Sequence, residues 1–274
     1  NDDRGIDAGT HTSLKVYNSL FQDINNYAIY INENDYIIDN CTFLDNNYGF
    51  YQSGYSQSEV RGEIKNSIFE GHGNSAIRAN SSSYGPDIIN TKVLNNNSGI
   101  IEVHDIYNCI VANNDSNWAV ENSNSLINST VVSNYRGAYN VNTVKNSIIF
   151  FNANDQIQNC NSVTYSNIMG GYSGEGNTDQ NPGFSDFYNF ELHPSSPCID
   201  AGDPSGAYND LCFPPSQGEA LNDIGVYGGP NACGWITTGC TDPEADNYDP
   251  TATYDDGSCI YSWPDPENLF FSEY

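Results

Sequence analysis

The sequence predicts an all-β protein built on a right-handed parallel β-helix, a solenoid of about eight coils. One short motif, an apolar stretch followed by asparagine and a small residue, recurs through the first 170 residues. The motif returns at intervals of 18 to 26 residues, as expected for coils with loops of changing length. Each unit contains a second turn signal and a further apolar stretch, so it reads as three short strands separated by turns.

The motif aligns seven segments, of which Val16-Tyr17-Asn18-Ser19-Leu20 is the first. The seven motif asparagines are Asn18, Asn40, Asn66, Asn90, Asn108, Asn128 and Asn146. An eighth unit, Val163-Thr164-Tyr165-Ser166-Asn167-Ile168, places Ser166 at the key position. Such short strands do not suit a hairpin meander with few tight turn signals, but stacked coils pair each strand with its equivalent one rung away.

Asparagine at this position has a physical reason. It tolerates the left-handed backbone of a sharp turn, and its amide can bond to the rungs above and below. The next residue is always Ser, Thr or Cys, which predicts an inward ladder of small side chains. Cys41 and Cys109 lie three rungs apart, about 14 Å by the strand spacing, so we expect two buried free thiols and no disulfide between them.

On these residues the chain resembles the right-handed parallel β-helix family, the pectate-lyase-like solenoids, over roughly residues 5–170. The resemblance implies the fold and an asparagine ladder. It leaves the function open, because lyases, glycosidases, adhesins and phage tail parts share this fold. We therefore assign residues 1–180 to the β-helix.

Residues 181–237 break the periodicity and resemble the ending of many secreted bacterial β-helix proteins, as in Ser196-Pro197-Cys198-Ile199-Asp200-Ala201-Gly202. A solenoid needs a cover over its last exposed rung, so we expect this segment to be a C-terminal cap. We expect Cys212 and Cys233 to form a disulfide that fastens the cap. Whether Cys160 and Cys198 pair stays open.

Residues 238–262 resemble a repeat of surface and secreted proteins from type IX-secreting bacteria, GCTDPxAxNYxPxAxxDDGSC. The resemblance predicts a Cys240–Cys259 disulfide, which so small a unit needs. Five carboxylates could bind Ca²⁺ or act as turn formers: Asp242, Asp246, Asp249, Asp255 and Asp256. Residues 263–274 form a linker, and Leu269–Tyr274 resembles the opening strand of a lamin-tail-type domain.

The charge of −27 is uneven, since residues 146–274 hold 19 acidic and no basic side chains. Such a surface repels nucleic acid and anionic membranes, and no apolar run is long enough to insert into a bilayer. The cysteines indicate an oxidising compartment, extracellular or at the cell surface. The polar start without a signal peptide indicates an internal or mature fragment, exported by the type IX machinery through a domain outside this chain.

The sequence contains one candidate catalytic motif. Gly71-His72-Gly73 matches a motif of polygalacturonase-like glycosidases and has Arg78 nearby, but the paired aspartates expected on the preceding coil are absent. A structural His72 in a loop is the competing interpretation. The basic residues are too few and too scattered for a polyuronate lyase without bound Ca²⁺.

Aromatic residues favour binding instead. Tyr48, Tyr51, Tyr55 and Tyr84 lie in or beside the longer loops of coils two and three, where exposed rings could stack on sugars or simply pack on the strands. The first hypothesis is a non-catalytic surface module, a rigid spacer or adhesin-like rod that binds polysaccharide or other surface proteins. The alternative is a polysaccharide lyase or glycosidase that acts along the β-helix groove.

Overall fold

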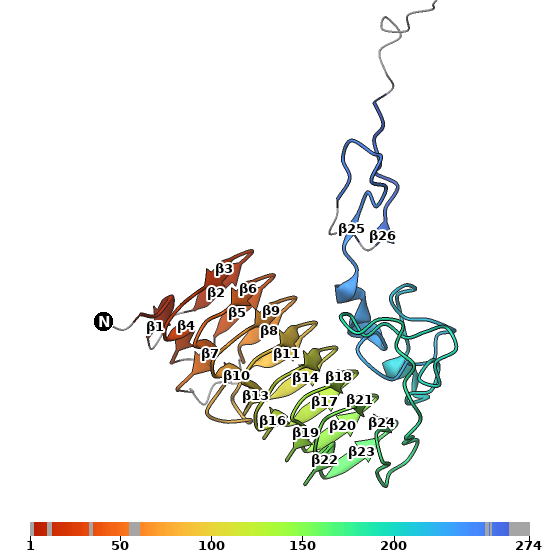
Figure 1. Cartoon of the computed structure of the whole chain (residues 1–274), viewed down its shortest axis with the longest axis horizontal. Helices are drawn as coiled ribbons and strands as arrows, with labels where there is room; N and C mark the ends of the chain where they lie inside the picture. Colours follow the sequence, from red (N-terminus) through yellow and green to blue (C-terminus); the bar gives the residue numbers. More distant parts are fainter. Residues whose placement is uncertain are drawn as a thin grey trace, which may run out of the picture. The chain divides into compact units, whose positions relative to one another are not determined.

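The computed structural model describes residues 3–9, 13–32, 35–54, 61–249, 252 and 254–262. The chain is an all-β parallel solenoid in which each coil adds one strand to each of three eight-stranded parallel sheets (Figure 1). It divides into an N-terminal unit, Asn1–Cys233, and a C-terminal unit, Gly234–Tyr274. The parallel β-solenoid predicted from the asparagine motif is confirmed. None of the helices among the described residues has the length and apolarity to span a bilayer.

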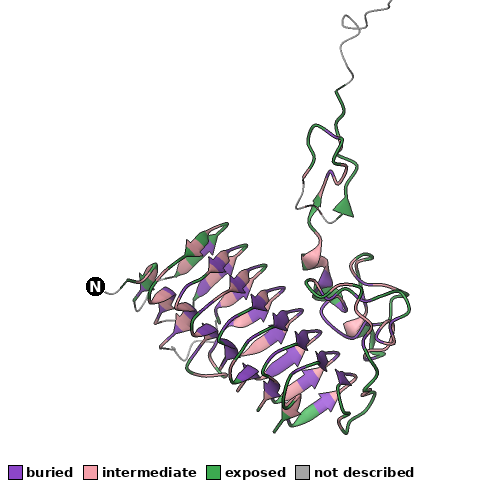
Figure 2. Cartoon of the chain, in the orientation of Figure 1, coloured by how far each residue is buried: buried purple, intermediate pink, exposed green. Residues whose placement is uncertain are grey.

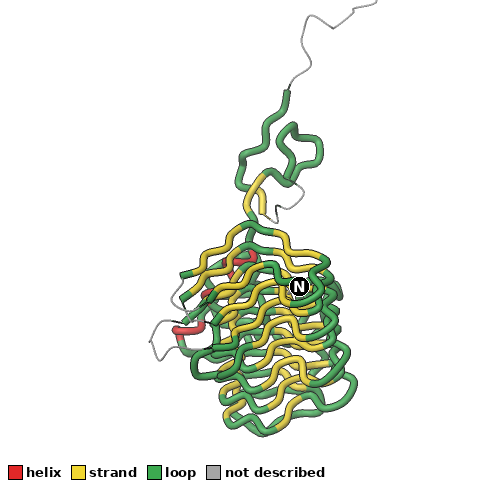
Figure 3. Tube along the Cα trace, turned by 90° about the vertical axis from the view of Figure 1, so that its left-hand side faces the viewer, coloured by secondary structure: helices red, strands yellow, loops and turns green. Residues whose placement is uncertain are grey.

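The three sheets, here called A, B and C, form the three sides of the coils, and Figure 3 shows their strands stacked coil upon coil. Sheet A contains β1 (Ile6–Ala8), β4 (Tyr27–Ile31), β7 (Tyr48–Gln52), β10 (Ser75–Arg78), β13 (Ser98–Ile101), β16 (Trp118–Glu121), β19 (Arg136–Tyr139) and β22 (Ile157–Gln158). Sheet B contains β2 (Leu14–Tyr17), β5 (Tyr36–Asp39), β8 (Glu63–Lys65), β11 (Asp87–Ile89), β14 (Asp105–Tyr107), β17 (Ser125–Ile127), β20 (Thr143–Lys145) and β23 (Ser162–Thr164). Sheet C contains β3 (Leu20–Gln22), β6 (Thr42–Leu44), β9 (Ile68–Glu70), β12 (Lys92–Leu94), β15 (Ile110–Ala112), β18 (Thr130–Val132), β21 (Ile148–Phe150) and β24 (Asn167–Ile168).

The core runs along the solenoid axis as columns of equivalent side chains. In sheet C, Phe43 stacks between Phe21 and Phe69, with ring centroids 4.9 and 4.2 Å away. Further coils continue such columns with fully buried Ile, Val and Leu side chains, and Figure 2 shows this burial along the strands of the middle coils. Burying one such side chain stabilises the fold by about 1.5–3 kcal/mol, so the repeated columns compensate for very short strands.

The motif asparagines form the corner between sheets B and C. All seven have positive φ, from 47° to 53°, as the turn geometry requires. One assignment is wrong: Lys145 pairs with Thr164, which places Tyr165, at φ 50°, opposite Asn146. Ser166 is instead the residue after the turn, and its hydroxyl accepts a hydrogen bond from the Ser147 N–H at 3.2 Å.

The small residues after the turn form the expected inward ladder. Ser67 Oγ accepts from the Cys41 N–H, and Ser129 Oγ accepts from the Cys109 N–H, each at 3.1 Å. Cys41 and Cys109 are buried free thiols, as predicted. Burial raises the pKa of the Cys109 thiol to about 12, so it stays protonated and behaves as a small apolar side chain.

The amide ladder lies at a different corner from the one expected. Among the motif asparagines, only Asn40 donates to the amide of its predecessor, Asn18, at 2.7 Å. The continuous ladder lies between sheets C and A, where each buried side chain accepts the N–H of the equivalent residue one coil earlier. Its members are Asn46, His72, Asn96, Asn114, Asn134 and Asn152, and Gln156 ends it.

Two segments contact the last coil, one before and one within the predicted cap. The last rung is covered by an earlier stretch: Glu175 and Thr178 accept backbone hydrogen bonds from Tyr165 and Ile168, and Asn177 accepts one from Ser166. Residues 181–233 include η1 (Gly206–Tyr208) and the start of η2 (Pro230–Trp235). This segment bonds to the B–C corner, and its Cys198 Sγ also accepts a hydrogen bond from Asn167 of the last rung at 3.1 Å. The corner asparagines that face this segment bond to it, which explains why their amides do not form a ladder.

Three corner asparagines make these contacts. Asn108 donates to the carbonyls of Val226 and Gly228 at 2.8 and 2.7 Å. Asn128 donates to Asn222 at 3.1 Å, and the Oδ1 of Asn146 accepts the Asp203 N–H at 2.8 Å.

The predicted disulfides Cys212–Cys233 and Cys240–Cys259 are both present. Cys160 and Cys198 are free and buried, so the open question of their pairing is answered in the negative. In the C-terminal unit, β25 (Thr238–Gly239) pairs in parallel with β26 (Tyr254–Asp255). The linker and possible lamin-tail-type strand within residues 263–274 lie outside the described part of the chain.

Candidate functional site

A polar groove forms at the corner between sheets A and B because the connections there shorten along the chain. Residues 79–86 link β10 to β11 with a long loop. From β13 onward, only three residues connect a strand of sheet A to the next strand of sheet B, as in Glu102–His104 and Asn122–Asn124. The step from long to short connections leaves a hollow beside the last long loop.

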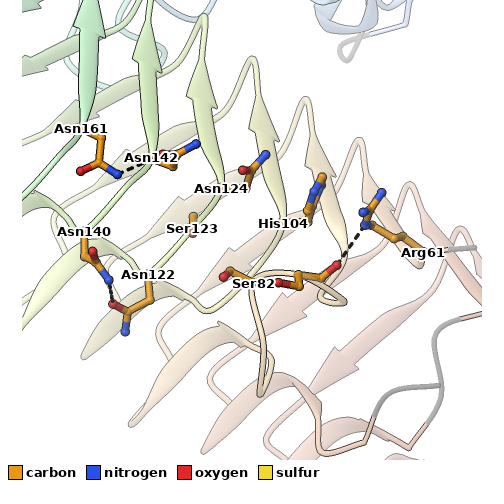
Figure 4. A pocket seen from close by; sticks show the side chains of 10 residues that line it. Arg61, Ser82, His104, Asn122, Ser123, Asn124, Asn140, Asn142 and Asn161 are labelled. Carbon is orange, nitrogen blue, oxygen red and sulfur yellow. Dashed lines mark hydrogen bonds between the residues drawn. The ribbon is translucent and has the colours of Figure 1, made fainter. Parts of the chain in front are cut away.

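The groove has a volume of about 350 Å³ and crosses several coils (Figure 4). Its lining is almost entirely polar: Arg61, Ser82, Ser83, His104, Asn122, Ser123, Asn124, Asn140, Asn142 and Asn161. Asn140 donates to Asn122 at 2.7 Å and Asn161 donates to Asn142 at 3.0 Å, so these amides are held in fixed orientations. Arg61 Nε donates to the Ser83 carbonyl at 3.4 Å and joins the edge of the long loop.

One wall of the groove continues into a cluster of His104, Asp87 and Asp105. His104 Nδ1 lies 3.0 Å from Asp87 Oδ1 and 3.0 Å from Asp105 Oδ2. The side chains are 16%, 28% and 14% exposed, respectively, so all three are partly shielded from water. Parallel pairing places the two aspartates on adjacent strands, β11 and β14, in the same register.

Neighbouring residues orient this cluster. Asp105 Oδ1 accepts hydrogen bonds from Asn124 Nδ2 and Ser125 Oγ, each at 2.7 Å. Tyr107 donates its hydroxyl to Asp105 Oδ2 at 3.1 Å. Burial and the Asp105 charge raise the pKa of Tyr107 to about 12, and burial raises the pKa of Asp87 above its usual range.

Sequence reasoning missed this cluster, although a signal was present. Glu63, Asp87 and Asp105 each stand three residues before a motif asparagine, so the repeat places them in one row of sheet B. The aligned acidic residues of coils three to five, followed across the repeat, would have identified the row.

The catalytic candidates named from the sequence, His72 and Arg78, lie outside the groove. His72 is 2% exposed and belongs to the buried amide ladder, where its Nδ1 accepts the Asn46 N–H at 3.2 Å and its own N–H donates to Asn96. Burial lowers its pKa to about 4. The position does not suit contact with a substrate, and it agrees with the interpretation of His72 as a structural residue, in the short connection between β9 and β10. Arg78 ends β10, paired with Tyr51 of β7.

The candidate sugar-binding tyrosines are only partly brought together. Tyr48 and Tyr51 of β7 join Tyr27 and Tyr30 of β4, with Tyr27 ring centroids 4.6 Å from Tyr48 and 5.0 Å from Tyr51. Rings this close pack against one another, as in the interpretation of these tyrosines as strand-surface packing. Tyr84 lies in the loop before β11, and Tyr55 lies outside the described residues.

The side chains of four of the five acidic candidates of the tail act locally as hydrogen-bond acceptors. Asp242 accepts the Glu244 N–H at 2.9 Å, and Asp255 and Asp256 accept the N–H groups of Gly257 and Ser258 at 2.9 and 3.0 Å. Asp246 accepts the N–H and hydroxyl of Ser262, and Asp249 has its N–H bonded to Cys240. These bonds fit turn formation, and Ca²⁺ binding by this group stays a prediction.

Comparison with known proteins adds little. No family model matches the chain, and no solved structure matches it. It is 70% identical over 27 residues to the chloroplastic ribulose bisphosphate carboxylase/oxygenase activase of Spinacia oleracea, and 64% identical over 28 residues to activase 1 of Larrea tridentata. These matches cover 10% of this chain and 6% of each relative, too little to show a family.

Proposed function

We propose that the chain is a non-catalytic module of a larger extracellular or cell-surface protein, a rigid solenoid that binds neutral carbohydrate in the A–B groove. The amide-lined groove is the observation that carries the proposal. Amide, hydroxyl and guanidinium groups are the usual partners of sugar hydroxyls, and several of the groove amides are already oriented by their neighbours. Preorganised donors and acceptors lose little conformational entropy on binding.

Charge favours a neutral ligand over an acidic one. The chain carries a net charge of −27, and two of its carboxylates, Asp87 and Asp105, lie in the cluster beside the groove. A polyuronate would be repelled, whereas neutral hexoses carry no such penalty. The two disulfides support an oxidising location, and type IX export and attachment to other surface proteins remain parts of the proposal.

Replacing Asn142 with alanine is expected to weaken binding of neutral oligosaccharides by about five- to thirtyfold, because one exposed amide supplies one or two hydrogen bonds of about 1 kcal/mol each. The purified chain is tested against gluco-, manno- and galacto-configured oligosaccharides on an array, and positive ligands are titrated by calorimetry. The matched control is Asn154→Ala, an exposed asparagine that does not line the groove. Equal losses in both variants, or no ligand at all, would contradict the groove assignment.

The enzyme alternative moves from His72 to the cluster of Asp87, His104 and Asp105. Its specific support is a histidine held by two carboxylates on the wall of a groove, an arrangement that can transfer protons. A turnover screen on polysaccharides separates the two proposals. Cleavage that is abolished by His104→Asn and kept by His72→Asn would replace the binding module with a hydrolase or lyase.

A further inference from the structure

We propose that Asp87, His104 and Asp105 form a binding site for one divalent transition-metal ion, with Zn²⁺ as the expected occupant. The proposal goes beyond carbohydrate binding and does not depend on it. One ligand atom from each residue lies within 4.8 Å of the others, and His104 Nδ1 lies 3.0 Å from an oxygen of each aspartate, so a small shift of the side chains lets one ion reach all three.

The hydrogen bonding of the cluster leaves room for a cation. His104 Nδ1 stands 3.0 Å from two carboxylate oxygens on different strands, yet this nitrogen carries at most one proton to share between them. Asp87 and Asp105 occupy paired positions of adjacent rungs, so their negative charges repel across one strand spacing. A metal ion at the common point would replace the shared proton and neutralise both carboxylates.

The surroundings resemble the supporting contacts of a metal centre. Asn124, Ser125 and Tyr107 all donate to Asp105, and the Asp105 N–H donates to Asp87 Oδ1 at 3.3 Å. Such contacts fix the direction of the ligand oxygens before the ion arrives. His104 also lines the groove, so a further coordination position would face solvent and any ligand held there.

The donor types select the metal class. An imidazole with two carboxylates suits Zn²⁺, Co²⁺, Mn²⁺ or Ni²⁺, whereas Ca²⁺ takes six to eight oxygen ligands and Mg²⁺ prefers oxygen and water. This choice also separates the cluster from the acidic tail, whose carboxylates offer oxygen alone. Zn²⁺ is expected to bind most tightly among the commonly available ions, and Co²⁺ provides a spectroscopic substitute.

The test uses the full chain after treatment with a chelator and dialysis. Calorimetric titration with ZnCl₂ is expected to give one saturable site, and Co²⁺ is expected to produce visible absorption bands that Zn²⁺ abolishes. His104→Asn and Asp105→Asn are each expected to reduce Zn²⁺ affinity by at least about tenfold. His193→Asn, which removes an exposed imidazole outside the cluster, is expected to keep both affinity and bands.

Folding is checked in each variant by circular dichroism, and Asp87→Asn replaces any variant that unfolds. The absence of a saturable Zn²⁺ site in the folded wild-type chain would overturn the proposal. So would an unchanged Zn²⁺ affinity in both His104→Asn and Asp105→Asn, because that result assigns the ion to other carboxylates of the acidic surface. Binding of oligosaccharides is measured in a separate experiment, so failure of the groove proposal leaves this outcome unaffected.

Discussion

Replacement of Asn134 with alanine is expected to destabilise the N-terminal unit by about 3–5 kcal/mol. The Asn134 side chain is 2% exposed and takes part in five hydrogen bonds of the buried ladder. Alanine would leave the Asn114 N–H and amide without their acceptor, and two backbone carbonyls without one of their donors. Each unsatisfied buried group costs about 1–3 kcal/mol, and the vacated volume adds to the loss.

The measurement is the free energy of unfolding from urea titration followed by circular dichroism, supported by the melting temperature. Asn154→Ala is the matched control, since Asn154 is exposed and its amide makes a single resolved bond, to the Tyr135 carbonyl at 3.1 Å. We expect a change within about 0.5 kcal/mol there. A comparable loss in both variants would show that the ladder contributes no more than an ordinary surface amide.

The sequence predicted the solenoid well because its signal is geometric and repeats. Seven asparagines at the B–C corner all adopt the left-handed conformation that the motif implied, and the residue after six of them is buried in the inward ladder. A left-handed turn is a local property, so it can be read from one residue and its spacing. The register of the eighth coil could not be read in this way, because Tyr165 takes the turn conformation without resembling asparagine.

Long-range contacts were the part that local patterns could not supply. The amides of Asn108, Asn128 and Asn146 bond to residues 203–228 and not to one another. The repeat contains no signal that this later segment packs against it. The groove depends on a difference in loop length between neighbouring coils, and its chemistry depends on residues one coil apart. The spacing of the motif contained the length difference, yet only the stacked structure places Asp87, His104 and Asp105 together.

His72→Asn is expected to change how stability depends on pH. His72 occupies a ladder position that asparagine fills in the other coils from Asn46 to Asn152, and a Cβ on Gly49 would lie 2.7 Å from its Nε2, so the two residues fit each other. Burial lowers the pKa of His72 to about 4, below its unfolded value of about 6.5. The folded state therefore holds the neutral ring, and its contribution is complete above pH 6.5 and is lost as the pH falls towards 4.

Integrated over this interval, the lowered pKa corresponds to about 3 kcal/mol of stability that wild type loses on acidification and His72→Asn does not. Unfolding free energies of wild type and His72→Asn are compared at pH 8 and at pH 4. Titration of the carboxylates is common to both proteins, so it cancels when the variant is subtracted from wild type at each pH. The difference in unfolding free energy between variant and wild type should shift by about 3 kcal/mol in favour of the variant at pH 4. His193→Asn, which replaces an exposed imidazole, is the matched control. Protonation would also set an N–H of the ring against the Asn46 N–H, so the ladder bond itself opposes the charged form. An unchanged difference between the two pH values would mean that His72 accepts a proton inside the folded solenoid, and its place in the ladder would then have to be abandoned.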